Sequence, residues 1–239
     1  MIYHNLQGKV VMVTGASSGL GEALAHAFGR NGCKVYLGAR SEEKLQDLAK
    51  KIELFGVGDV KAIPLKLDVT DYAQVNAAAD YMVAKEGRID IWVNNAGGET
   101  PASILDITPQ QLKDITAVNY FGLVYGTQAA AKQMIKQKEG DIVQILSTSA
   151  FTPRANELGY CSAKAAAEMA TECSQLELKQ YGIRVIPVSP GGMATNFAQN
   201  AGLQSPPKAM NPHDVADSIL NALAKPRNIE TELRLYRKG

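Results

Sequence analysis

The chain has 239 residues, of which 46% are hydrophobic and 21% charged, and its 25 Lys and Arg against 24 Asp and Glu leave a formal charge of +1. High hydrophobicity with low net charge excludes intrinsic disorder and a polyanion-binding protein driven by bulk charge. The apolar stretches are too short to cross a membrane. We therefore expect a globular protein that binds neither nucleic acid nor membrane.

The cysteines and the N-terminus indicate a cytoplasmic protein. Cys33, Cys161 and Cys173 are odd in number and lack the spacing of metal ligands. This pattern favours reduced thiols over a disulfide framework and predicts no metal site. The first residues do not combine a basic region, an apolar stretch and a cleavage site, so no secretory signal is visible.

Short β-branched runs alternate with longer helical patterns along the chain. The predicted strands span residues 9–14, 33–38, 60–67, 89–94, 141–147, 183–189 and 232–236. The predicted helices lie near 19–31, 41–55, 71–86, 109–137, 158–181 and 212–224, with start signals at Ser41, Thr70 and Thr108. This alternation predicts a parallel sheet with helices on both faces. Because no linker interrupts it, we expect one doubly wound α/β domain over residues 1–239, with a lid loop at about 190–210.

A glycine-rich turn, TGASSGLG at residues 14–21, follows the first predicted strand and opens a helix. Three glycines let the backbone turn tightly, approach a phosphate and pack the helix against the strand. The N–H groups at the helix start would then face the pyrophosphate of a dinucleotide. The alternative is a glycine-rich turn without a ligand.

The second predicted strand ends at Arg40, and no carboxylate follows it to hold a ribose 2′-hydroxyl. Arg40 stands where a 2′-phosphate would lie, and Ser17 or Ser18 can assist it. A charge-assisted hydrogen bond of ~1.5–3 kcal/mol would favour NADP over NAD by roughly ten- to a hundredfold. The alternative is that Arg40 pairs with Glu43 on the helix surface.

The other distinctive residues also follow predicted strands. They are Asp68 and Val69, residues 94–97 (NNAG), Ser147 and residues 190–192 (PGG). The carboxyl ends of parallel strands share one edge of a sheet, where open α/β sheets bind their ligands. We therefore expect these residues in one site, with Asp68 and Val69 beside an adenine.

Tyr160 and Lys164 are four residues apart at the start of a predicted helix, so they share a face. A free tyrosine has a pKa near 10, and a neighbouring cation favours the phenolate. Such a tyrosine can protonate an alkoxide or deprotonate an alcohol. Ser147, at the tip of a strand, can hold the substrate oxygen. Taken alone, the Tyr–Lys spacing is also typical of a surface pair.

Together these residues resemble the classical short-chain dehydrogenase/reductase (SDR) family over nearly the whole chain. The shared motifs are TGASSGLG at 14–21, LDVTD at 67–71, NNAG at 94–97, Asn119, Ser147, YCSAK at 160–164 and PGGMAT at 190–195. The resemblance implies a Rossmann-type domain with a seven-stranded parallel sheet in the order 3-2-1-4-5-6-7. It also implies a catalytic tetrad of Asn119, Ser147, Tyr160 and Lys164.

The resemblance also implies a role for each of these residues. Tyr160 would be the general acid/base, Lys164 would lower its pKa and bind the nicotinamide ribose, and Ser147 would orient the carbonyl. Asn119 would hold a water that links Lys164 to solvent. The implied cofactor-binding residues are Gly15, Ser17, Ser18, Gly19, Leu20, Gly21, Arg40, Asp68, Val69, Asn94, Ala96, Gly97, Tyr160, Lys164, Pro190, Gly191 and Thr195.

Two departures from the family pattern bear on function. Residues 144–147 read QILS where many members carry NISS, which we expect to leave catalysis intact. The C-terminus lacks the DGG ending of the acyl-carrier-protein ketoreductases, which argues against a role in fatty-acid synthesis. The resemblance is closer to the broad group of small aldehyde, ketone or hydroxy-acid oxidoreductases.

The resulting hypothesis is an NADP(H)-dependent oxidoreductase that interconverts a carbonyl (aldehyde, ketone or keto acid) and an alcohol. The alternative is a catalytically silent dinucleotide-binding sensor or interaction protein. We expect the substrate wall at residues 98–100, 150–158 and the lid, with Phe151 and Phe197 as apolar walls. Arg154 faces either solvent or an anionic substrate. The family pairs its long helices across a two-fold axis, which implies a homodimer or homotetramer.

Overall fold

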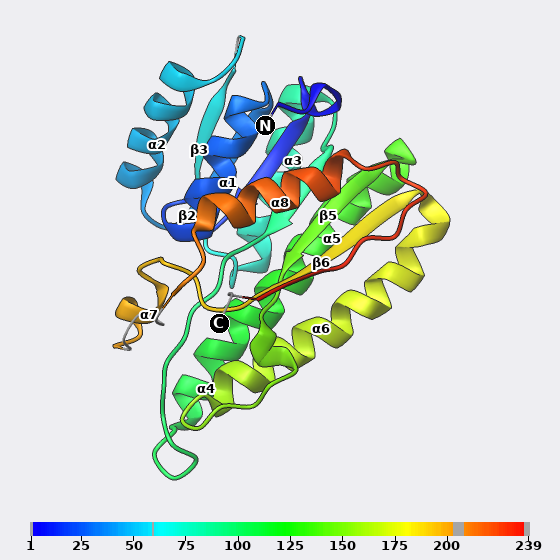
Figure 1. Cartoon of the computed structure of the whole chain (residues 1–239). Helices are drawn as coiled ribbons and strands as arrows, with labels where there is room; N and C mark the ends of the chain where they lie inside the picture. Colours follow the sequence, from blue (N-terminus) through cyan, green and yellow to red (C-terminus); the bar gives the residue numbers. More distant parts are fainter. Residues whose placement is uncertain (1, 59, 203–207, 237–239) are drawn as a thin grey trace.

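The computed structural model describes residues 2–58, 60–202 and 208–236, and its centre is one parallel β-sheet (Figure 1). The strand order, β3-β2-β1-β4-β5-β6-β7, confirms the predicted sheet. Every neighbouring pair of strands runs parallel. The strands are β1 (Val10–Thr14), β2 (Lys34–Ala39), β3 (Ala62–Lys66), β4 (Ile91–Asn94), β5 (Gly140–Ile145), β6 (Ile183–Pro190) and β7 (Leu233–Leu235).

Helices cover both faces of the sheet, as the alternation predicts (Figure 1). One face carries α1 (Gly19–Arg30), α2 (Glu42–Phe55) and α8 (Pro212–Ala224), and the other carries α3 (Tyr72–Glu86), α5 (Gly122–Gln137) and α6 (Leu158–Leu178). The shorter helices are η1 (His4–Leu6), α4 (Pro109–Thr116), η2 (Ala117–Phe121), η3 (Thr148–Ala150), η4 (Lys179–Tyr181) and α7 (Phe197–Asn200).

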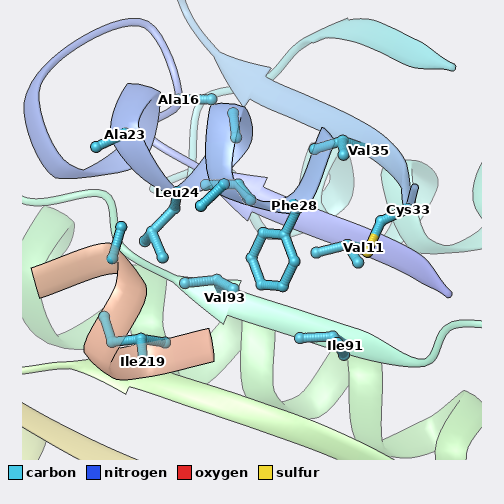
Figure 2. Close-up of a cluster of buried hydrophobic side chains, with 14 of the residues drawn as sticks. Val11, Ala16, Ala23, Leu24, Phe28, Cys33, Val35, Ile91, Val93 and Ile219 are labelled. Atoms are coloured by element: carbon cyan, nitrogen blue, oxygen red, sulfur yellow. The ribbon is translucent and has the colours of Figure 1, made fainter. Parts of the chain in front are cut away.

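Buried apolar side chains fix the helices to the sheet. Figure 2 shows the layer between the sheet and α1, where Phe28 and Leu24 lie over Val93 and meet Ile219 of α8. Trp92 neighbours Val93 on β4 but points to the opposite face, into the cluster formed with α3 and α5. This alternation along one strand explains why β4 is buried at every position.

Helix starts agree with the sequence only in part. Thr108 forms the predicted cap: its side chain accepts from the Gln111 N–H, and the Gln111 side chain accepts in return from the Thr108 N–H. At α3 the cap is Asp71 rather than Thr70, because the Asp71 carboxylate accepts from two backbone N–H groups. Ser41 precedes α2 but makes no side-chain capping bond.

The helix predicted at 109–137 is three consecutive segments, because the π-helix η2 separates α4 from α5. The side chain of Asn119, inside this π-turn, donates to the Ile115 and Gly98 carbonyls at 2.9 and 2.8 Å. A π-helical turn contains one more residue than an α-helical turn, and this small change is not visible in the spacing of the apolar residues. The sequence therefore predicted a continuous helix. Turns of this type are frequent at functional sites.

Asn94, expected to bind the cofactor, lies instead inside a buried polar network. Its side chain accepts from Trp92 Nε1 at 2.8 Å and donates to Gln144 Oε1 at 2.9 Å and Thr127 Oγ1 at 3.2 Å. Gln144 also donates to Thr127. The departure QILS thus places a fully buried glutamine beside Asn94. The Gln144 side-chain carbonyl accepts from Asn94, and its amide group donates to Thr127. The network ties β4, β5 and α5 together.

Replacing Asn94 with alanine leaves the Trp92 N–H and the Gln144 carbonyl buried without their partner. We expect Asn94→Ala to lower the free energy of unfolding by about 2–4 kcal/mol, measured by urea denaturation. Asn221→Ala, at an exposed position of α8, is the control and should change stability by less than ~0.5 kcal/mol. A loss of NADPH affinity without a loss of stability would contradict the structural role of Asn94.

Candidate active site

A cavity of about 1420 Å³ lies at the carboxyl edge of the sheet. The predicted site residues that line it come from the ends of six strands, β1 to β6, and from the start of α6, as expected from their position in the sequence. They are Gly15, Ser17, Ser18, Gly19, Leu20, Arg40, Asp68, Val69, Ala96, Gly97, Ser147, Tyr160, Lys164, Pro190, Gly191 and Thr195. Gly21, Asn94 and Asn119, also predicted, are not among the lining residues.

The glycine turn needs its glycines for two different reasons. Gly15 and Gly19 have positive φ values of 65° and 59°, which only glycine adopts without strain. Gly21 instead allows a close approach, because a Cβ there would lie 2.3 Å from the Gly15 carbonyl oxygen. Ser18, at the N-cap of α1, makes no side-chain bond to the helix. The turn therefore presents backbone and the start of a helix to the cavity, which suits a phosphate.

The end of the cavity beside β2 is basic. Arg40 is exposed there and makes no ion pair, with Glu43 or any other acid, within the described part of the chain. Lys44, which the sequence analysis missed, lines the cavity with Arg40, Ser17 and Ser18. Lys44 lies in the first turn of α2, and its position only four residues after Arg40 is the signal that was available in the sequence.

Tyr160 and Lys164 lie together at the start of α6 and are both buried, with 8% and 4% of their surfaces exposed. The Lys164 Nζ donates to the Ile145 carbonyl at 2.9 Å and lies 5.8 Å from the centre of the Tyr160 ring. Ser147 caps the short helix η3, where its hydroxyl accepts from the Ser149 N–H at 3.1 Å. Three of the four tetrad residues thus face one cavity.

The electrostatics of this pair differ from the sequence expectation. Burial raises the pKa of Tyr160 above its ordinary value, and a hydrogen bond from Ser147 opposes that shift only in part. Burial also lowers the pKa of Lys164, to about 8. In the protein by itself, desolvation therefore dominates the pKa of Tyr160. Tyr160 is a protonated phenol at neutral pH, which is the form of a general acid.

Asn119 lies behind the cavity wall rather than in it, with only 1% of its surface exposed. Its side chain accepts from the Gly98 N–H at 3.4 Å and donates to the Gly98 carbonyl. A Cβ on Gly97 would lie 2.9 Å from Asn119 Oδ1 and 3.8 Å from Lys164 Nζ. The π-turn of η2 therefore fixes the loop after β4 close to Lys164.

The lid contributes Thr195 and Phe197. A Cβ on Gly19 would lie 3.3 Å from the Thr195 side chain, so Thr195 covers the glycine turn. The ring of Phe197 lies 5.8 Å from that of Tyr160, as expected of an apolar wall. The other predicted wall, Phe151, does not line the cavity because its ring packs against the Arg234 guanidinium at 4.3 Å. Lid residues 203–207 lie outside the described part of the chain.

Comparison with known proteins identifies the family. The profile of the short-chain dehydrogenases matches residues 9–205. This chain belongs to that family. It is 33% identical over 224 residues to an uncharacterized oxidoreductase of Staphylococcus aureus (strain USA300), covering 94% of each chain. It is also 36% identical to a dehydrogenase/reductase SDR family protein 7-like of Anopheles gambiae, covering 92% of this chain and 74% of that protein.

Solved structures of the family superimpose closely on the short-chain dehydrogenase fold of this chain. An alcohol dehydrogenase from Thermococcus sibiricus, complexed with 5-hydroxy-NADP, is 25% identical, with a TM-score of 0.88 and 97% of each chain covered. A dehydrogenase/reductase from Mycobacterium marinum is 31% identical, with a TM-score of 0.87 and 96% and 94% of the two chains covered. The chain is therefore an NAD(P)-dependent oxidoreductase that acts on CH–OH groups. Among its described helices, none has the length and apolarity to span a bilayer.

Burial of Lys164 predicts a pH-dependent stability. The folded-state pKa of about 8 lies below the ordinary lysine pKa of 10.5, so the folded chain binds fewer protons than the unfolded chain between these pH values and its stability rises with pH. Below pH 8 the full cost is present, at about 3 kcal/mol. We expect Lys164→Met to stabilise the cofactor-free protein at pH 7 by up to this amount, and by much less near pH 10.5.

Urea denaturation at pH 7 and near pH 10.5, with wild type and variant side by side, measures this effect. Lys113→Met, at an exposed position of α4, is the matched control and should show no such pH dependence. An equal loss of stability in Lys164→Met at both pH values would contradict the proposed cost of burying this charge.

Proposed function

We propose that the protein is an NADP(H)-dependent carbonyl reductase or alcohol dehydrogenase that uses Tyr160 as its general acid/base. The observation that carries the proposal is the burial of Tyr160, Lys164 and Ser147 in the cavity that the glycine turn opens into. Their placement follows the order of the family motif, residue by residue. The bound dinucleotide supplies the hydride for reduction of a carbonyl, or accepts it from an alcohol.

In reduction, Ser147 and Tyr160 donate hydrogen bonds to the carbonyl oxygen and so stabilise the charge that develops on it. Tyr160 then transfers its phenolic proton to that oxygen. The Lys164 ammonium stabilises the resulting phenolate, more strongly because both groups are out of water. In oxidation the same groups act in reverse. Asn119 keeps the loop after β4 in place through its hydrogen bonds to Gly98.

The residues present fit NADP better than NAD. A Cβ at Gly15 would lie 2.8 Å from Ala96 Cα, so the turn and the loop after β4 make close backbone contact at the cradle for a pyrophosphate. At the basic end, Arg40 and Lys44 offer two cations to a 2′-phosphate, and no carboxylate lies at the tip of β2 to receive a 2′-hydroxyl. The 7α-hydroxysteroid dehydrogenase with NADH, 26% identical with a TM-score of 0.88, shows that the family also holds the other dinucleotide.

We further infer that residues 1–239 form one domain and that the chain assembles as a homodimer or homotetramer. Met169 and Leu176 on α6 leave 60% and 79% of their surfaces exposed, which suits an interface between copies. Cys33, Cys161 and Cys173 are unpaired thiols, which supports a cytoplasmic location.

Removal of the Tyr160 hydroxyl tests the chemistry. We expect Tyr160→Phe to lower kcat for reduction of aldehydes or ketones with NADPH by at least ~10²-fold, because general acid catalysis is lost. NADPH affinity, measured by fluorescence titration, should stay within about twofold, since the ring is retained. Tyr181→Phe, on the exposed helix η4, is the control. A wild type that binds NADPH but turns over no carbonyl or alcohol would favour the silent dinucleotide-binding protein.

Removal of the Arg40 charge tests the cofactor preference. We expect Arg40→Gln to weaken NADPH binding by roughly ten- to a hundredfold while NADH binding stays the same, because only NADPH carries the 2′-phosphate. Arg30→Gln, at an exposed site of α1 outside the cavity, is the matched control. Equal losses for both dinucleotides, or a wild type that prefers NADH, would contradict the role of Arg40.

A further inference from the structure

Two carboxyl side chains line the part of the cavity that the dinucleotide contacts do not account for. Glu99 comes from the loop after β4, and Glu157 immediately precedes α6, three residues before Tyr160. A backbone bridge between Ala102 and Glu157, and a 2.8 Å hydrogen bond from Ala102 N–H to the Asn156 carbonyl, hold the two segments together. The position of both acids beside the catalytic tyrosine is therefore built into the backbone.

Each acid buries an oxygen that accepts no hydrogen bond. Within the described residues, Glu99 Oε1 and Glu157 Oε2 are inaccessible and have no hydrogen-bond partner, and only Glu157 Oε2 has a cation within ion-pair distance. A buried acceptor without a donor costs free energy, and the cost is larger when the group is charged. Burial, with Glu157 nearby, accordingly raises the pKa of Glu99 to about 7. A ligand that donates hydrogen bonds to this pair would remove the cost.

One cation pairs with one of the two acids. Arg154 Nη1 lies 3.5 Å from Glu157 Oε2, and 44% of the Arg154 side chain remains exposed. Arg154 lines the cavity together with the acids, and its ion pair leaves Glu99 without an ion pair among the described residues. Asp114 adds a further acid to the cavity lining. The bases at this end are Arg154 and Lys164, so the acids outnumber the bases by one, which favours a substrate cation over a carboxylate or phosphate.

Building on the proposed function, we propose that the substrate carries a protonated amine close to its carbonyl or alcohol carbon, and that Glu99 and Glu157 bind that amine. An ammonium has three donors and a positive charge, so it can satisfy both carboxyl groups at once, whereas a hydroxyl has one donor. Bound in this way, the amine would place the reacting carbon beside Tyr160, because Glu157 immediately precedes α6 and Tyr160 lies in the first turn of that helix. Glu99 and Glu157 are thus the residues that determine specificity for an amino ketone or amino alcohol.

Three probe alcohols that differ only in one terminal group test this assignment. Isopropanolamine, sec-butanol and β-hydroxybutyrate share one CH3–CH(OH)–CH2 unit and end in an ammonium, a methyl group and a carboxylate. Their affinities are measured by calorimetry on the protein loaded with NADPH or NADH, whichever binds more tightly, because an alcohol is not oxidised in that complex. We expect isopropanolamine to bind at least about tenfold more tightly than sec-butanol, and β-hydroxybutyrate to bind most weakly.

The double variant Glu99→Gln/Glu157→Gln should reduce the preference for isopropanolamine over sec-butanol to within about threefold, because the amides keep the shape and remove the charge. Glu172→Gln, at an exposed position of α6, is the control and should keep the full preference. The wild-type comparison stands without the variants if the double variant does not fold.

Equal affinity for isopropanolamine and sec-butanol, tighter binding of β-hydroxybutyrate, or no measurable binding of isopropanolamine would overturn the proposal. The binding measurement does not depend on turnover. Turnover of neutral alcohols without preference for the amine would therefore remove this inference and leave the oxidoreductase intact. Preferential amine binding in a protein without turnover would support the carboxyl pair and remove the proposed function.

Discussion

The removal of Tyr160 and Lys164 from water is the constraint on which the rest of the site depends. An ammonium that is 4% exposed needs a partner, and the Ile145 carbonyl at the end of β5 supplies it. That carbonyl is available because β5 ends there, so the length of the strand fixes the position of Lys164. Desolvation then makes the interaction between Lys164 and a Tyr160 phenolate stronger than it would be in water. The same burial makes both charges costly in the resting protein.

Close backbone packing places the dinucleotide loops around this pair. Gly15 contacts Ala96, Gly19 contacts Thr195, and Gly97 lies against Asn119 and Lys164, so each loop contacts the next through a glycine. A Cβ at Gly15 or Gly97 would come within 3 Å of a neighbouring atom and force it to move, and one at Gly19 would require Thr195 to shift by a few tenths of an ångström. The glycines therefore keep the catalytic groups and the phosphate cradle within one continuous wall, which explains why motifs far apart in the sequence act together.

Periodicity and residue spacing were sufficient to predict most elements and the parallel sheet, because those features depend on local patterns that repeat. The Tyr160–Lys164 spacing became informative only together with the other motifs of the family. Contacts across the chain were not predictable in this way. Asn94 follows a strand like the other site residues, yet Trp92 and Gln144 turn it into a structural group. The π-turn at Asn119 adds one residue to a helix without changing its apolar pattern. Phe151 has the apolar side chain expected of a substrate wall, but Arg234, which is distant in the sequence, packs against its ring.

The two ends of the cavity differ in the charged side chains that line them. Arg40 and Lys44 lie at the end beside β2, whereas Glu99 and Glu157 lie at the end beside Tyr160. The net charge of +1 conceals this asymmetry, because it averages over acids and bases that lie at opposite ends of one cavity. An anionic group is stabilised at the first end and repelled at the second, so a dinucleotide phosphate and a cationic substrate would each enter the half that suits it. Electrostatics would then contribute to orienting both ligands toward Tyr160 before any catalytic contact forms.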